Sequence, residues 1–380
     1  MDEPDHGQLW DTIRRNRELA EERARLAPEV GEAAGRAGLW SLTAPKECGG
    51  AELPLPTLLT WFERLGEADP TVGWHAVNSI PTGLVSARLG ERERAAVLAR
   101  LDRPFGYAGA LAAGVAMVPD DGGFRLRGTW PFMTGAADAS WATATVMVTD
   151  ADGRPAAPRD VRRIVFPLAD AEVGETWQAA SGMRGTGSHA VAVTDLYVPE
   201  TMAVPLDAPP LLDRPLFNIN DAVLFFAPCA AMAVGILRSA TAAVIELVGG
   251  KISRFDGHAH FDDPRIQQYV ADAVAAAECL SAGLERVCGR YWDRQVEAAS
   301  PEPERRARLW SVVFASFDVA RYHVSNLYAV GTSSAYATRN PIERALRDVH
   351  ALNAAFDSFQ SLRRAAGRSL LGHEPNHPRF

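Results

Sequence analysis

The sequence predicts an α+β protein in three consecutive parts, and three changes of pattern along the chain support this prediction. Apolar residues recur at helical spacing through roughly the first hundred residues. Short alternating segments between glycine-rich turns follow, and long helical stripes occupy the remainder. We therefore expect a helical domain over 1–103, an antiparallel β domain over 104–205 and a helical bundle over 206–380.

The composition is that of a soluble globular protein: 380 residues, 47% hydrophobic, 23% charged, with a net charge of −8. An acidic balance argues against binding nucleic acid, which requires a concentrated basic surface. The four cysteines lack CxxC or zinc spacing, so we expect no metal site and free thiols in a reducing compartment. The charged N-terminus lacks a signal-peptide apolar region, which favours a cytoplasmic location.

The first domain is predicted to be helical throughout. Residues 6–39 place Leu9, Trp10 and Ile13 on one face of an amphipathic helix. A loop with Pro45 and two glycines precedes the next helix, and Asp69-Pro70 opens another that contains Trp74, His75 and Asn78.

The C-terminal part is predicted to be a bundle of long antiparallel helices. The apolar run 222–237 contains Pro228 and is shorter than the ~20 residues of a membrane span, so a buried bundle helix is the better interpretation. Asp263-Pro264 is a helix start with an N-cap acid and proline at the first position. The helix that follows is expected to carry one apolar stripe, formed by Ile266, Val270, Val274, Ala277, Leu280, Leu284 and Val287.

The segment 128–141 is the first candidate for a binding site. Phe132 and Thr134 lie two residues apart, so an extended chain places them on one face. Gly135 allows a close backbone approach. An aromatic wall beside a hydroxyl suits a flat ring edged with heteroatoms, such as an isoalloxazine. A plain hairpin in a β core remains the alternative interpretation.

A second segment, 183–199, has the same build of a Gly/Ser/Thr turn followed by an alternating strand that ends at Pro199. The sequence motifs "GTWPF" at 128–132 and "GMRGTGS" at 182–188 resemble motifs of the acyl-CoA dehydrogenase superfamily. The resemblance is strongest to its two-component flavin monooxygenases, which hydroxylate aromatic or polyketide substrates with reduced flavin from a separate reductase. It covers nearly the whole chain.

This resemblance implies a set of flavin contacts. Phe132, Thr134 and Gly135 would meet the ring, with Tyr107 and Ala110 on a second strand. A turn before the last helices would hold the phosphate-bearing tail through backbone N–H groups, and Arg254 is the candidate cation. The residues of that turn are Gly331, Thr332 and Ser333.

The catalytic residues of the superfamily are not all present. Dehydrogenases use a glutamate as base, and its position here holds Phe356, although Glu246 or Glu278 could substitute from another helix. The helix with Arg347-Asp348-Val349 resembles the corresponding helix of the monooxygenases. Their closing histidine, however, corresponds to Ala355 here, and an alanine side chain cannot exchange a proton.

Three other histidines could serve. His75 is the preferred catalytic candidate, because its neighbours are apolar and a buried imidazole needs a partner such as Asn78. His189 follows the Thr-Gly-Ser turn and would lie near the ring. His350 faces a different direction from position 355.

Three hypotheses for the function follow. The main one is a monooxygenase that takes reduced FMN or FAD from a transient reductase partner and hydroxylates an aromatic, polyketide-like or amine substrate in a biosynthetic pathway. A dehydrogenase of acyl thioesters with bound FAD is the second. A scaffold that acts as a non-redox cyclase or binding protein is the third. We expect a homotetramer or homodimer assembled through the bundle, without a nucleic-acid or membrane partner.

Overall fold

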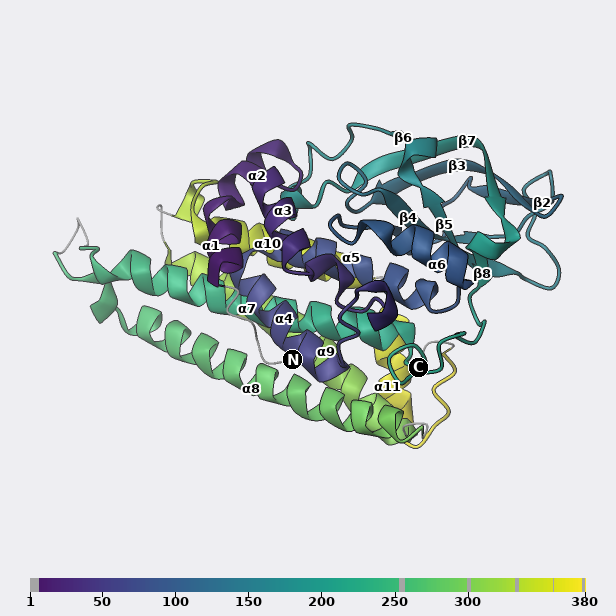
Figure 1. The fold of residues 1–380 in the computed structure, drawn as a ribbon. Coiled ribbons are helices and arrows are strands. Elements are labelled where there is room, and N and C mark those ends of the chain that lie inside the picture. Colours follow the sequence, from purple (N-terminus) through teal and green to yellow (C-terminus); the bar gives the residue numbers. More distant parts are fainter. Residues whose placement is uncertain (1–6, 253–256, 299–301, 332–334, 358, 378–379) are drawn as a thin grey trace. The chain divides into compact units, whose positions relative to one another are not determined.

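The computed structural model (Figure 1) describes residues 7–252, 257–298, 302–331, 335–357, 359–377 and 380. The chain forms two compact units that are discontinuous in sequence. The first unit holds the chain up to Leu53 together with 74–180 and 184–221, and the second holds 54–73, 181–183 and 222–380. The α+β class is confirmed. The predicted domain boundaries at 103 and 205 both fall inside the first unit, which includes 74–180 and 184–221. The division into three domains stays a prediction.

Helices make up the N-terminal region. Their bounds are α1 (Gly7–Arg15), α2 (Arg17–Arg23), α3 (Pro28–Arg36), α4 (Leu55–Ala68), α5 (Pro70–Ser86) and α6 (Glu91–Val97). The helix α1 buries Leu9, Trp10 and Ile13, as its spacing predicted. Nearly every residue of α5 is buried, so its polar side chains must find hydrogen bonds inside the protein.

Two four-stranded sheets form the middle of the first unit. One has the order β1-β4-β5-β8 and the other β2-β3-β7-β6. The strands are β1 (Gly106–Ala108), β2 (Ala116–Asp120), β3 (Gly123–Met133), β4 (Trp141–Met147), β5 (Val161–Pro167), β6 (Glu172–Val173), β7 (His189–Pro199) and β8 (Ala203–Pro205). Both sheets contribute to one apolar core, in which Trp130 of β3 stacks on Phe166 of β5 at 5.7 Å between ring centroids.

One strand pairing differs from the expected antiparallel lobe. The strand β1 runs parallel to β4, whereas the other pairs of named strands are antiparallel. Parallel neighbours need a long connection, and β2 and β3 supply it between β1 and β4. Tyr107 also forms an antiparallel bridge with Thr134, so β1 lies between the end of β3 and β4.

The second unit is a helical bundle. Its helices are α4, α7 (Asp221–Gly249, from residue 222 on), α8 (Pro264–Val296), α9 (Pro303–Val330), α10 (Pro341–Asp357) and α11 (Gln360–Leu370). The helix α9 contacts α8, α10 and α11, and Figure 1 shows α8 and α9 running alongside each other. Phe356 of α10 packs in the aromatic centre of this bundle, stacked on Phe317 at 4.5 Å.

Glycines let α4 and α7 approach at backbone distance. A Cβ on Gly66 would lie 2.1 Å from the Met232 carbonyl oxygen, and one on Gly235 would lie 2.0 Å from that of Glu63. Real Cβ atoms do not come this close, so each position accepts only glycine without a shift of backbone. The crossing explains why an otherwise continuous apolar helix contains a glycine at 235.

The helix α7 is the one described helix that is long and apolar enough to cross a membrane by length and composition. Its most apolar window is 83% buried within the protein. That degree of burial is typical of a core helix, which agrees with the prediction from the sequence.

The start of α8 was predicted correctly, and its buried face was predicted in part, since Ile266, Ala277 and Leu284 of the expected stripe are buried. The Asp263 side chain accepts from the Arg265 backbone N–H, and Pro264 occupies the first turn. Val274, however, is 46% exposed, and the buried residues are Ile266, Ala273, Ala277, Leu284, Cys288 and Tyr291. Which residues of this 33-residue helix are buried depends on the helices that pack against it, and helical spacing alone does not identify those neighbours.

Candidate flavin and substrate site

The candidate site of the first unit forms where the end of β3, the start of β7 and the helix α5 meet. Met133 pairs with His189 at the last register position of β3 and β7. Thr134 follows and exchanges two backbone hydrogen bonds with Tyr107, at 3.2 and 3.3 Å. The Gly135 N–H donates to the Thr186 carbonyl oxygen at 3.2 Å. The two sequence motifs therefore lie side by side.

A chain of hydroxyl groups runs through this junction. The Thr134 hydroxyl accepts from the Trp74 indole N–H at 2.9 Å and lies 3.0 Å from the Ser188 hydroxyl. The Ser188 hydroxyl lies 3.0 Å from that of Thr186. Thr134, Ser188 and Thr186 are all buried, so this chain orients their lone pairs and protons. Trp74, Ser188 and Thr186 were not predicted as site residues, although Trp74 precedes His75 directly.

His75 is fully buried on α5. Its Nε2 lies 3.1 Å from the Gly185 carbonyl oxygen. A carbonyl oxygen only accepts, so Nε2 carries the proton in this contact and Nδ1 of the neutral ring is an acceptor. A Cβ added to Gly135, whose φ is +75°, would lie 3.2 Å from that Nδ1. His75 therefore touches the same turn that carries Thr134.

Asn78 is buried one helical turn from Trp74, and its amide donates to the Trp74 carbonyl oxygen at 2.7 Å. His75 Nε2 thus has the backbone carbonyl of Gly185 as its partner, and the Asn78 amide, which we expected there, donates to Trp74 instead. The sequence could not identify that partner, because 110 residues separate the two.

His189 lies at the other side of the junction and is also buried. Its Nδ1 accepts from the backbone N–H groups of Thr176 at 3.1 Å and Trp177 at 3.3 Å. Burial lowers the pKa of the His189 imidazole, and the positive charge of Arg25 lowers it further. Glu175 and Asp138 oppose this shift. The ring is therefore held neutral with a proton on Nε2.

Phe132 and Thr134 have different surroundings. Phe132 is 65% exposed and meets Trp177 edge-on, with ring centroids 6.0 Å apart, whereas Thr134 is 6% exposed. A register shift between Trp130 and Met133 interrupts the alternation on which the shared-face expectation depended. A large aromatic ring left this exposed is available to a flat ligand.

Tyr107 and Ala110 lie on the neighbouring strand and just after it. The Tyr107 side chain hydrogen-bonds Arg163, a buried guanidinium that also donates to Asp221 at 2.6 Å. A Cβ on Gly109 would lie 2.5 Å from the Tyr107 hydroxyl, so the ring folds back over this glycine. Ala110 is exposed. Arg163 and Asp221 were not predicted and have no local sequence signal.

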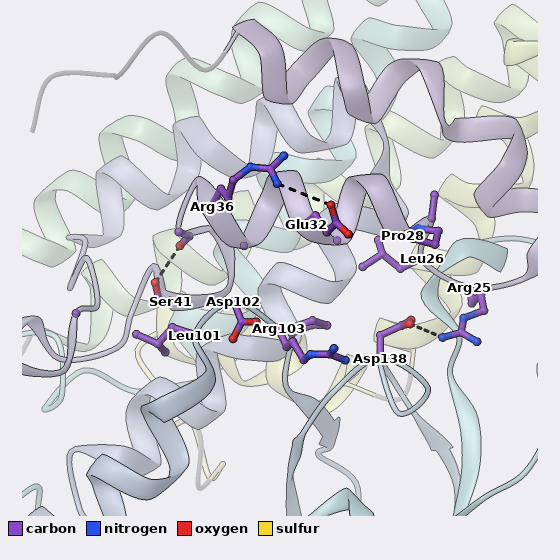
Figure 2. A pocket seen from close by; sticks show the side chains of 16 residues that line it. Arg25, Leu26, Pro28, Glu32, Arg36, Ser41, Leu101, Asp102, Arg103 and Asp138 are labelled. Carbon is purple, nitrogen blue, oxygen red and sulfur yellow. Dashed lines mark hydrogen bonds and ion pairs between the residues drawn. The ribbon is translucent and has the colours of Figure 1, made fainter.

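A pocket of about 730 Å³ is lined in part by Asp138, which lies in the turn that follows Gly135. Figure 2 shows Arg25 paired with Asp138 at one end and Arg36 with Glu32 across from it. Its volume lies within the roughly 300–1,000 Å³ range of small-molecule sites. None of the predicted flavin or catalytic residues lines it, so it gives no support to their assignment.

The second unit holds the other end of the same motif. The Met183 backbone N–H donates to the buried Asp348 carboxylate at 2.6 Å, and Arg347 donates to the Ser181 carbonyl oxygen at 2.6 Å. A Cβ on Gly182 would lie 2.4 Å from the Arg347 carbonyl oxygen. The Arg-Asp pair of α10 therefore fastens the start of the "GMRGTGS" segment.

The position that corresponds to the dehydrogenase glutamate carries no carboxylate. Phe356 is a core residue, and Ala355 is exposed. Glu246 is exposed, and Glu278 forms an ion pair with Arg238 that lowers the pKa of its carboxyl. Among the described residues, no group of three His, Cys, Asp or Glu side chains is arranged to hold a metal ion.

Only part of the predicted phosphate site can be located. Gly331 is buried at the end of α9, while Arg254, Thr332 and Ser333 lie outside the described residues.

The residues of the first unit fit a flavin ring. Phe132 offers an exposed aromatic face, and Thr134 offers a hydroxyl within an oriented hydrogen-bond chain. Gly135 keeps the turn beside them free of a side chain at positive φ. An apolar surface next to directed polar groups is the usual construction of a cofactor site.

Comparison with known proteins gives the same family in two places. The family described as "Acyl-CoA dehydrogenase, C-terminal domain" matches residues 227–357, and "Acyl-CoA dehydrogenase, N-terminal domain" matches residues 10–101.

Curated relatives include a pigment production hydroxylase of Rhodococcus erythropolis, which is 26% identical over 94% of this chain and 93% of its own length. The flavin-dependent monooxygenase oxygenase subunit HsaA of Mycobacterium tuberculosis is 26% identical over 90% of this chain and 88% of its own.

Solved structures agree at the level of the fold. The 3-HSA hydroxylase of Rhodococcus sp. RHA1 has a TM-score of 0.88 at 22% identity and covers 100% of both chains. XiaF from Streptomyces sp., solved with FADH2 and glycerol, has a TM-score of 0.84 at 22% identity and covers 98% of this chain and 97% of its own.

Proposed function

Because the chain belongs to the acyl-CoA dehydrogenase superfamily, we propose that it is the oxygenase component of a two-component flavin monooxygenase. In this proposal a separate reductase supplies reduced FMN or FAD, and the chain hydroxylates an aromatic substrate. The observation that carries the proposal is the junction of Phe132, Thr134 and His75 at the ends of β3 and β7.

The bound reduced flavin would supply two electrons and activate O₂, so that one oxygen atom enters the substrate and the other leaves as water. Phe132 would pack against the flavin ring, and the Thr134 hydroxyl would bond a heteroatom at its edge. The Trp74 N–H and the Ser188 hydroxyl hold that hydroxyl in one orientation, so its direction is fixed before the ligand arrives.

His75 is the proposed acid–base residue. Its Nε2 proton is committed to the Gly185 carbonyl, so Nδ1 is the atom that would take or return a proton beside the Gly135 turn. Burial removes competing water from this position. Asn78 would position the substrate from the next turn of α5.

The alternative as an acyl-thioester dehydrogenase has less support. That reaction requires a carboxylate to remove a proton, and the corresponding position is Phe356 in the aromatic core. No feature of the described residues favours the non-redox alternative over the oxygenase.

The decisive experiment combines the purified chain with a flavin reductase, NADH and either FMN or FAD, and then measures conversion of simple phenols and indoles. We expect hydroxylated product that requires both reduced flavin and the chain. Failure to bind either flavin in either redox state would overturn the proposal. A yellow protein bleached by acyl-CoA would favour the dehydrogenase, and turnover without flavin would favour the non-redox scaffold.

We also propose a cytoplasmic homotetramer or homodimer assembled through the bundle. The exposed face of α8 and the exposed apolar side chains of Val274 on α8 and Tyr322 on α9 support this assembly. Light scattering of the purified protein measures the mass directly, and a strict monomer would contradict it.

A further inference from the structure

The segment 174–184 contains a side chain that the sequence did not mark. Trp177 is half-buried and presents its indole to Phe132 at an angle of 77° between ring planes. Edge-to-face contacts of this kind fix the orientation of both rings. Because Phe132 is otherwise exposed, Trp177 is the aromatic neighbour that limits how its ring can turn.

Three sets of hydrogen bonds hold this segment in place. The Trp177 indole N–H donates to the Arg184 carbonyl oxygen at 3.0 Å. The Arg184 guanidinium donates to the carbonyl oxygens of Gln178 at 2.6 Å and Ala180 at 2.8 Å. The third set belongs to His189, which accepts from both Thr176 and Trp177.

The His189 side chain accepts backbone hydrogen bonds just beyond the end of the β6–β7 pairing. The Gly174 N–H donates to the Ala190 carbonyl at 2.9 Å, and the Ala190 N–H donates to the Thr176 hydroxyl at 2.8 Å. Beyond that point the N–H groups of Thr176 and Trp177 face the His189 ring in place of a strand backbone. One unprotonated nitrogen thus substitutes for the missing ladder carbonyl.

We propose that His189 is a positioning residue whose neutral imidazole holds Trp177 against Phe132 and thereby orients the aromatic wall of the flavin site. This inference rests on the proposed function for the identity of the ligand. It assigns His189 no proton transfer. A protonated ring would have N–H groups on both nitrogens, and Nδ1 could no longer accept from the backbone.

The charges around His189 make this contact sensitive to pH in one direction. Three charged groups face His189. Arg25 lies in the segment after α2, Asp138 in the turn after Gly135, and Glu175 in the loop that follows β6. Burial and Arg25 place its pKa below the ordinary value of 6.5. The neutral acceptor is therefore present at neutral pH and is lost as pH falls through the folded pKa.

The test uses two substitutions that differ in one property. His189→Asn keeps an oxygen acceptor near the position of Nδ1 but cannot titrate, and His189→Leu removes the acceptor. At pH 7.5 we expect His189→Leu to weaken reduced FMN or FAD binding by about tenfold, because the Thr176 and Trp177 N–H groups lose their acceptor. His189→Asn should stay within about twofold of wild type. The matched control is His323→Leu, a half-buried histidine on α9.

A second measurement needs no flavin. In protein labelled with ¹⁵N-tryptophan, the indole signal of Trp177 is the one absent from Trp177→Phe. We expect it to shift as pH falls below 6.5 in wild type and to stay fixed in His189→Asn. Thermal unfolding checks that each variant folds.

The outcomes separate this inference from the proposed function. If wild type binds no flavin but the indole signal titrates as described, the contact stands and the function fails. If wild type hydroxylates phenols while His189→Leu binds flavin normally, the positioning role is wrong. An indole signal that titrates equally in His189→Asn would also overturn it.

Discussion

The Asp348 carboxylate accepts a hydrogen bond from the backbone N–H of Met183 at 2.6 Å. Met183 has a φ of +53°, a conformation that non-glycine residues adopt only when their surroundings impose it. Asp348 is buried and sits on α10, so a helix residue far along the chain fixes the entry into the "GMRGTGS" segment. Asp348 therefore has a structural role, because it holds the backbone of the "GMRGTGS" segment at Met183.

Removal of the Asp348 carboxylate should destabilise the protein. Asp348→Ala leaves the buried Met183 N–H without this acceptor, and hydrogen bonds to charged groups contribute about 1.5–3 kcal/mol. Urea unfolding should report a loss of that size. Asp357→Ala, at an exposed position at the end of the same helix, is the control and should change the free energy of unfolding by less than about 0.5 kcal/mol. Equal losses in both variants would contradict this account.

The crossing of α4 and α7 predicts opposite effects for two alanine substitutions. Gly235→Ala forces backbone apart at a 2.0 Å clash and should cost at least about 2–3 kcal/mol, comparable to severe overpacking. Gly289→Ala on α8 meets nothing within 4 Å and should stabilise by about 0.5–1 kcal/mol, because alanine favours the helix. The pair can be compared in one chemical denaturation series. A neutral Gly235→Ala would show that the helices can separate freely.

His75→Ala should reduce product formation by at least about tenfold, since a general acid or base contributes ~10²–10⁴-fold. The variant should still bind reduced flavin, and this combination distinguishes a catalytic loss from a folding defect. Coupled assays that quantify product and hydrogen peroxide together measure both effects. His373→Ala, an exposed histidine near the C-terminus, is the control. Full coupled activity in His75→Ala would make His75 a packing residue.

The Thr134 hydroxyl should matter for affinity rather than for stability alone. Thr134→Val keeps the shape but removes the acceptor of the Trp74 indole, and we expect reduced-flavin affinity to fall by about tenfold, or ~1.4 kcal/mol. Thr134→Ser retains the hydroxyl and should recover most of the binding. Thr194→Val, at an exposed position of β7, controls for the loss of a hydroxyl elsewhere in the strands. If Thr134→Ser binds as weakly as Thr134→Val, the methyl group and not the hydroxyl is responsible.

Local rules predicted the elements that local interactions determine. The N-cap of α8 at Asp263 and the buried face of α1 follow from short-range spacing, and both are confirmed. The parallel pairing of β1 with β4 and the exposure of Val274 depend on which distant segment lies alongside, and the sequence contains no short-range signal for either.

The candidate site divides in the same way. Spacing and motif identified Thr134, Phe132 and His75 as candidates, but not their partners. The Gly185 carbonyl that binds His75 is 110 residues away, and the Trp74 indole that binds Thr134 is 60 residues away. His189 was expected near the ring because it follows the Thr-Gly-Ser turn, and its described hydrogen bonds accept from the backbone of Thr176 and Trp177. A single sequence lists side chains but does not reveal which backbone groups need them.

The buried helix α7 also constrains how the chain can be made. Protein synthesis delivers Asp221–Gly249 before α8–α11 exist, and of the helices that pack in its unit only α4 precedes it. Until the last hundred or so residues emerge, a nascent chain carries an almost continuous apolar surface in water. Translation that pauses or stops soon after residue 250 therefore releases an aggregation-prone product. The helices α8–α11 are synthesised last, and by packing on α7 they keep the newly made enzyme soluble.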